Sequence, residues 1–350
     1  MLVDAMRGLS AIAVALFHFN ELPASAEPTD VVELWRAIWK HGHLGVPVFF
    51  VISGYCIGQT WLRTSDAKKF LRRRILRIFP PYWASLALLL VLALATKVLT
   101  GVNDIAPIPR GITSVVATVT LLTEPVTGFQ TMNWVYWSLS YEIAFYVIMT
   151  LALVSWPSRR LHALLPLHIV ICVTSALVNI ATPSPWFFIR LWPLFGLGIA
   201  VCLWETHRTA SLWTFAACAA HAIGFLLRGE QVNYFVVAWL ATAVLWLDPE
   251  IGGKSARVLA WAGRSSYSLY LIHVPVGCFV AMRFVPMPAD RTFLFFAGQS
   301  IVLVVCLLVA RLFFRCFERP FMGTGSKPNR AESPITGLPL SIPPENIQLQ

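Results

Sequence analysis

The chain has 350 residues, of which 57% are hydrophobic and only 13% are charged. That charge content is about half that of a soluble domain, and the apolar runs are too many for one soluble core to bury. The net charge of +10 lies in short loops between apolar segments, with no interleaved aromatic residues, which argues against nucleic acid as a partner. The composition therefore predicts an all-α, polytopic helix bundle in a lipid bilayer.

Ten apolar segments are long enough to be read as membrane spans. They cover residues 5–20, 44–62, 80–100, 134–155, 163–182, 186–204, 211–227, 231–247, 265–285 and 292–315. The segment 111–124 is too short for an ordinary span, and we expect it to be interfacial or re-entrant. With it left out, most of the 27 Lys and Arg residues fall on one side, which places both termini in the cytoplasm. We expect a membrane domain over 1–320 and a disordered cytoplasmic tail over 321–350.

The first segment carries two ionisable residues, Arg7 and His18, in otherwise apolar surroundings. Eleven residues are close to three helical turns, so both side chains project from one face, roughly 16 Å apart along the axis. Ionisable groups inside a bilayer are costly and usually functional. The alternative is that Arg7 extends to the interface and His18 only ends the helix.

A basic run before the third segment contains Arg73, Arg74 and Arg77. These residues are three and four apart on a helix, so their guanidinium groups can converge on a phosphate-bearing ligand. The alternative is a cluster that only orients the chain in the membrane. We expect Pro80 and Pro81 to open the third span.

The fourth segment carries Glu142, with Ser138 one turn earlier on the same face. A carboxylate at that depth needs a cation, a His or a proton as its partner. In the ninth segment, Tyr270 and His273 can face one cavity, although a core histidine satisfied by a hydroxyl is an equal alternative. The seven cysteines are not spaced as metal ligands, so we expect no metal.

Five motifs in register connect these residues to a known family. They are DAMRGLSAIAVALFHF, GVPVFFVISGY, FLRRRILRIFPPYW, WSLSYE and SYSLYLIH. Together they resemble the bacterial acyltransferase-3 family of membrane O-acyltransferases, over about residues 2–320. The chain departs from the family pattern at Ala5-Met6 in the first motif and at Ile143-Ala144 after the acid.

The resemblance implies transfer of an acyl group, most often acetyl, from cytoplasmic acyl-CoA to a hydroxyl of an exopolysaccharide, lipopolysaccharide or Nod-factor glycan. His18 would be the catalytic base or a transient acyl carrier, and Glu142 would orient it or act as a second acid. The donor would be bound by four arginines, Arg7, Arg73, Arg74 and Arg77. Further residues expected to line the site are Asp4, Ser53, Ser138, Tyr270 and His273.

The resemblance also implies a multi-pass protein of the bacterial inner membrane that works with polysaccharide biosynthesis machinery. The alternative function is a transporter or flippase for a glycan precursor, because such proteins also carry intramembrane Arg, Glu and His. The cytoplasmic arginine cluster with a single His in the outer half favours the acyltransferase.

Overall fold

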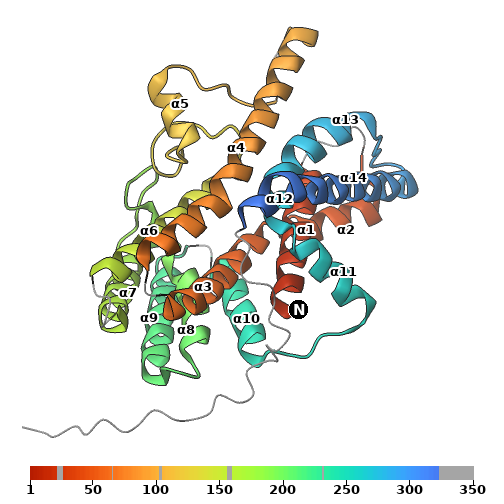
Figure 1. The fold of residues 1–350 in the computed structure, drawn as a ribbon. Coiled ribbons are helices and arrows are strands. Elements are labelled where there is room, and N and C mark those ends of the chain that lie inside the picture. Colours follow the sequence, from red (N-terminus) through yellow and green to blue (C-terminus); the bar gives the residue numbers. More distant parts are fainter. Residues whose placement is uncertain (22–26, 65, 102–104, 156–159, 231, 323–350) are drawn as a thin grey trace, which may run out of the picture.

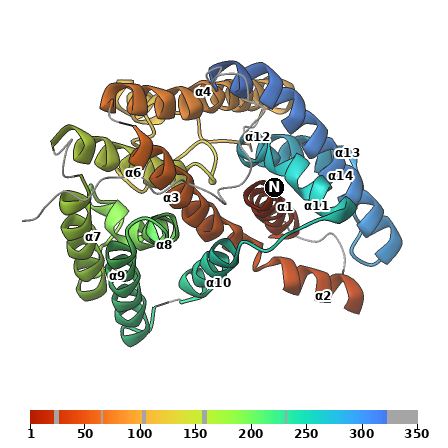
Figure 2. The ribbon, with the colours of Figure 1, turned by 60° about the horizontal axis from the view of Figure 1, so that its bottom comes forward.

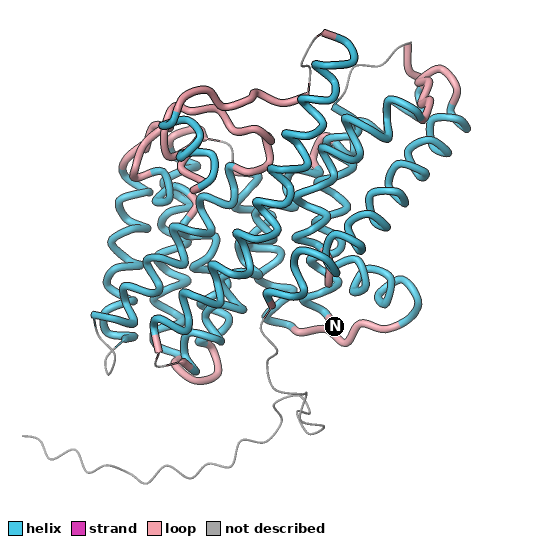
Figure 3. Tube along the Cα trace, turned by 45° about the horizontal axis from the view of Figure 1, so that its top comes forward, coloured by secondary structure: helices cyan, strands magenta, loops and turns pink. Residues whose placement is uncertain are grey.

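The computed structural model describes residues 1–21, 27–64, 66–101, 105–155, 160–230 and 232–322, and within these ranges the chain is helical with no strand (Figures 1 and 3). The first half contains α1 (Leu2–Glu21), α2 (Asp30–Trp39), η1 (Gly42–Leu44), α3 (Gly45–Arg63), α4 (Ala67–Thr100), α5 (Ile112–Val119) and α6 (Trp137–Ser155). The second half contains α7 (Arg160–Leu177), η2 (Phe187–Arg190), α8 (Trp192–Leu203), α9 (Arg208–Leu227), α10 (Asn233–Leu247), α11 (Gly253–Gly263), α12 (Ser266–Ile272), η3 (His273–Ala281), α13 (Met282–Phe284), α14 (Thr292–Phe313), η4 (Phe314–Glu318) and η5 (Arg319–Phe321).

The all-α class is confirmed, and the described part of the chain has seven helical segments long and apolar enough to cross a membrane. Shorter apolar helices, in α7, α8 and α10, occupy the other three predicted positions. The count of ten crossings and the cytoplasmic position of the termini stay predictions. Residues 323–350 of the predicted tail lie outside the described residues.

One difference from the sequence prediction concerns the start of the third span. Helix α4 begins at Ala67, where the Asp66 side chain accepts a hydrogen bond from the Lys69 amide, and it continues for 34 residues. Pro80 and Pro81 therefore lie inside a helix of about 50 Å and do not open it. Proline is tolerated inside a membrane helix where neighbouring groups satisfy the displaced backbone. The basic run is thus the first part of the same rod.

Helices also occur between the predicted spans. Helix α2 lies between the first and second of them and α11 between the eighth and ninth, and each has only a few buried residues. Helix α5 spans eight residues, or about 12 Å, so the segment 111–124 does not cross a bilayer. The Tyr82 hydroxyl and the Trp83 indole of α4 donate to backbone carbonyls at its end.

The centre of the molecule is the packing of α3 between α8 on one side and α1 on the other (Figure 2). Glycines allow α3 and α8 to approach: a Cβ at Gly54 would lie 2.0 Å from the Phe195 carbonyl oxygen, and one at Gly198 would lie 1.9 Å from that of Val51. Small residues at such a contact allow membrane helices to pack closely.

The ninth predicted span changes its winding at His273, where α12 gives way to the nine-residue π-helix η3. Pro275 has no N–H to donate to the carbonyl of Leu271, four residues earlier. That carbonyl accepts a hydrogen bond from the Asn133 side-chain amide instead, at 3.3 Å. The irregular turn places His273 in the core and ties the segment before α6 to it.

Candidate functional site: two cavities that share a wall

The first cavity, which we call the arginine cavity, encloses about 760 Å³ of empty space and is lined by residues of α1, α3, α4, α6 and α12. The residues predicted for the site that line it are Arg7, Ser53, Arg74, Arg77, Ser138, Glu142 and Tyr270. Three guanidinium groups that line one space suit an anionic ligand.

The arginines are held from neighbouring helices. Arg74 Nη2 donates to Thr60 Oγ1 at 3.1 Å, and its guanidinium lies over the Tyr146 ring at 5.9 Å from the centroid. Arg74 Nε is buried without a hydrogen-bond partner in the described chain. Arg7 lies 4.0 Å from the Asp4 carboxylate and 3.5 Å from Cys56 Sγ. These contacts fix the side chains and leave donors for a ligand.

Glu142 supplies a carboxylate to the same cavity. Its Oε1 accepts a hydrogen bond from Ser53 Oγ at 3.1 Å and another from the Tyr146 hydroxyl. Ser138, which the helical spacing had placed beside it, is hydrogen-bonded to Tyr270 instead. The two hydroxyls and the nearby arginines solvate the carboxylate inside the bundle, as a charge at this depth requires.

The second cavity, the histidine cavity, has a volume of about 800 Å³ and is lined by His18, Glu21, Lys40 and His43, among others. The His18 side chain is 13% exposed, and its ring stacks on that of His273 with 5.3 Å between centroids. Its Nδ1 lies 3.8 Å from Glu21 Oε2. The His18 ring thus borders open space and has a carboxylate near one of its nitrogens.

The two cavities share two lining residues, Val46 and Tyr270. The Tyr270 hydroxyl donates to the Val135 carbonyl at 2.9 Å and bonds Ser138 Oγ at 2.7 Å. Phe49 packs against the same ring in a T-shaped contact. Two side chains therefore separate the cavity with the arginines from the cavity with the histidine.

Three of the residues predicted for the site lie elsewhere than expected from the sequence, while their roles stay predictions. Glu142 does not line the cavity of His18, and the carboxylate beside that histidine is Glu21. Arg73 is exposed and does not line the arginine cavity, although it lies one helical turn before Arg77, which does. Asp4 contacts Arg7 without lining the cavity itself.

Several residues in or near the two cavities were not foreseen. Tyr146, which lines the arginine cavity, and Thr60, which accepts from Arg74, are ordinary hydroxyls on apolar helices, so no sequence signal sets them apart. Glu21 ends its helix in a position typical of a solvated acid. Glu318 lines neither cavity, but it is buried and accepts a hydrogen bond from Ser268 Oγ at 2.6 Å; it follows the last predicted span, where nothing in the sequence marks it as buried.

A separate cluster joins α7 to α9, where the metal-binding atoms of His168, Cys172 and Cys218 lie within 4.8 Å of one another. Spacing along the chain had not indicated it. The Trp192 indole donates to His168 Nδ1 at 2.9 Å, so the neutral ring carries its proton on Nε2, which faces the sulfurs. A metal-binding histidine donates from its distal nitrogen, which is the reverse arrangement. We therefore expect the cluster to be a hydrogen-bonded core contact.

The long apolar helices and the enclosed polar cavities define a multi-pass membrane protein. Residues 2–314 match the acyltransferase domain of the acyltransferase-3 family, and the chain belongs to that family. It is therefore a membrane acyltransferase by family.

Three relatives illustrate the family. A protein named as the membrane-bound transacylase BcsY of Komagataeibacter xylinus is 28% identical, covering 78% of this chain and 72% of that protein. Nodulation protein 10 of Rhizobium leguminosarum bv. viciae is 26% identical, covering 67% of this chain and 62% of its own. A protein named as an O-acetyltransferase of Staphylococcus aureus (strain COL) is 23% identical, and the match covers 93% of this chain and 58% of that protein. The chain thus spans less than two thirds of the last two. No solved structure matches it.

Proposed function

We propose that the protein transfers an acyl group, acetyl in the first instance, from cytoplasmic acyl-CoA to a hydroxyl of a cell-surface or exported glycan. The observation that carries this proposal is the shared wall at Tyr270, which brings an arginine-lined cavity and a histidine-lined cavity to the same place. An anionic donor and a hydroxyl acceptor can then enter separately and meet at one point. The named activities of the relatives agree with this chemistry.

Donor binding falls to the arginine cavity. Coenzyme A carries several phosphate charges, and Arg7, Arg74 and Arg77 offer guanidinium groups that pair with phosphate. The thioester end would extend toward Tyr270, which lines both cavities. Arg73 has no part in this cavity.

His18 acts on the acceptor. As a general base it removes the proton of the acceptor hydroxyl, whose oxygen attacks the thioester carbonyl carbon. The carbon–sulfur bond breaks, and the departing thiolate takes the proton back from the imidazolium, so atoms and charge balance. General base catalysis of this kind contributes about 10²–10⁴-fold. A transient acyl-His18 would divide the same reaction into two steps.

The test uses the full-length protein in lipid nanodiscs with labelled acetyl-CoA and the O-deacylated surface glycan of the producing cell. Release of CoA together with label on the glycan is the expected result. Arg74→Ala should raise the KM for acetyl-CoA roughly 10- to 100-fold, the loss of one charge-assisted phosphate contact. Arg72→Ala, which removes an exposed arginine of the same helix, is the matched control.

Two results would overturn the proposal. The first is glycan movement across the membrane without CoA release, which is the behaviour of a transporter. The second is substantial transfer by His18→Ala protein that inserts and folds normally.

A further inference from the structure

A third cavity, of about 860 Å³, opens beside the histidine cavity and has no part in the reaction described above. Aromatic side chains form much of its lining. Trp134 lies in the turn before α6, Trp137 is the first residue of α6, and Tyr141 follows one turn later. Trp134 is 44% exposed, and its ring contacts those of His18 and Phe279. An indole face left open inside a cavity is available to a ligand with a flat apolar surface.

The third cavity borders the site of His18. Trp137 lines both cavities, and the Trp134 ring lies 5.8 Å from the ring of His18. A ligand that reaches His18 and extends past it would therefore meet these two indoles next. The third cavity thus extends the acceptor side of the site, away from the arginines that face the donor.

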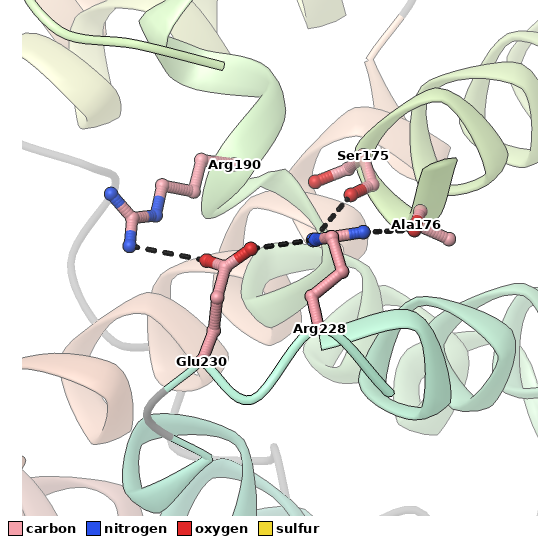
Figure 4. A network of polar contacts seen from close by, with 5 residues as sticks. All are labelled: Ser175, Ala176, Arg190, Arg228 and Glu230. Carbon is pink, nitrogen blue, oxygen red and sulfur yellow. Dashed lines mark hydrogen bonds and ion pairs between the residues drawn. The ribbon is translucent and has the colours of Figure 1, made fainter. Parts of the chain in front are cut away.

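Polar groups at the edge of this cavity complement the aromatic face. Arg190 lines it and is ion-paired with Glu230 at 3.3 Å, and Glu230 is also bound by Arg228 at 2.7 Å (Figure 4). The Nη1 and Nη2 atoms of Arg228 donate hydrogen bonds to the backbone carbonyls of Ala176 and Ser175, respectively. Two cations share one carboxylate, so the network keeps one positive charge.

That charge is offered to the cavity through Arg190. Arg190 donates to Glu230 through Nη2 alone, and the Arg190 side chain is 42% exposed. Glu124 and Thr131 add a carboxylate and a hydroxyl to the lining. Donors and acceptors around an aromatic floor match a sugar ring, which has apolar C–H faces and hydroxyls at its edge.

We propose that the third cavity is an acceptor subsite that binds the sugar unit next to the one acylated at His18. The acceptor is then an oligosaccharide of at least two units, stacked on Trp137 and Trp134 and hydrogen-bonded at Arg190 and Glu124. This inference rests on the proposed function for the identity of the acceptor. The aromatic floor itself belongs to the described structure.

The test measures binding before chemistry. The O-deacylated surface glycan of the producing cell is hydrolysed to fractions of one, two and four sugar units, and each is titrated into the nanodisc protein by calorimetry. The tetrasaccharide should bind at least ten-fold more tightly than the monosaccharide. Trp137→Ala should weaken tetrasaccharide binding about ten-fold, the loss of one stacked apolar face. Arg190→Gln, which leaves Glu230 paired with Arg228, should weaken it several-fold.

Trp186→Ala is the matched control, because this tryptophan is 61% exposed, lies four residues from Arg190 and does not line the cavity. Its tetrasaccharide affinity should equal that of the wild type. Equal affinity for one and four units, or wild-type affinity in both cavity variants, would overturn the subsite. Tight tetrasaccharide binding that the variants weaken, but without acyl transfer, would overturn the proposed reaction and keep the subsite.

Discussion

Replacing Glu21 by Gln distinguishes the carboxylate beside His18 from the one that the sequence had suggested. Glu21 Oε2 lies 3.8 Å from His18 Nδ1, so its charge would stabilise the imidazolium formed when His18 takes the acceptor proton. At this distance, two unit charges interact by about 1 kcal/mol in water and about 4 kcal/mol at the effective dielectric of a protein surface. The Glu21 side chain is 56% exposed, which favours the lower value.

Measured exposed ion pairs are worth about 0.2–1 kcal/mol, so we expect kcat to fall only about 1.5- to 5-fold in Glu21→Gln. His18→Gln should lose about 10²–10⁴-fold. The assay is transfer from labelled acetyl-CoA in nanodiscs at low salt, repeated at 1 M salt, where screening should shrink the Glu21→Gln effect.

The double variant completes the test. If Glu21 acts only through His18, adding Glu21→Gln to His18→Gln should change nothing further. A hundred-fold loss in Glu21→Gln alone, or a loss that persists in the His18→Gln background, would refute this reasoning and assign Glu21 a direct role.

Three further predictions concern stability and metal. Gln299→Leu should lower the free energy of unfolding by about 1–3 kcal/mol, because Gln299 Nε2 donates to the buried Asn20 Oδ1 at 2.9 Å. An unchanged midpoint of unfolding in detergent would contradict this prediction. Ser53→Ala should lower the free energy of unfolding by about 1.5–3 kcal/mol, because it removes the hydroxyl that donates to Glu142. If the variant resists urea as well as the wild type does, the contact contributes nothing to stability. Purified protein should contain no stoichiometric zinc and should keep its activity in EDTA, and bound zinc lost on His168→Ala would disprove the hydrogen-bonded assignment.

The positions of the helices could be read from the chain because hydrophobic length is a local property. A run of about 20 apolar residues predicts a span wherever it occurs, and the seven long apolar helices agree with that. The helical segments outside the predicted spans are those where hydrophobicity is not decisive. Helices α2 and α11 have only a few buried residues each, and the start of α4 is set by the cap at Asp66 rather than by the apolar run after Pro81.

The candidate site could be predicted only in part. Intramembrane ionisable residues stand out against an apolar background, which is why Arg7, His18, Arg74, Arg77 and Glu142 were identified from composition and spacing. Which of them face the same space could not be known. Helical periodicity relates residues of one helix, as it did for Arg74 and Arg77, but it says nothing of contacts between helices.

By itself, then, the sequence determined the class of the protein, the approximate place of its helices and the set of costly charges inside the bilayer. The tertiary structure alone decided how those charges are divided. It placed Glu142 with the arginines, Glu21 with His18, and Tyr270 as the wall between the two cavities. The physical reason is that hydrophobicity and helical period act along one helix, whereas a cavity is bounded by side chains from several helices whose packing is a property of the whole chain.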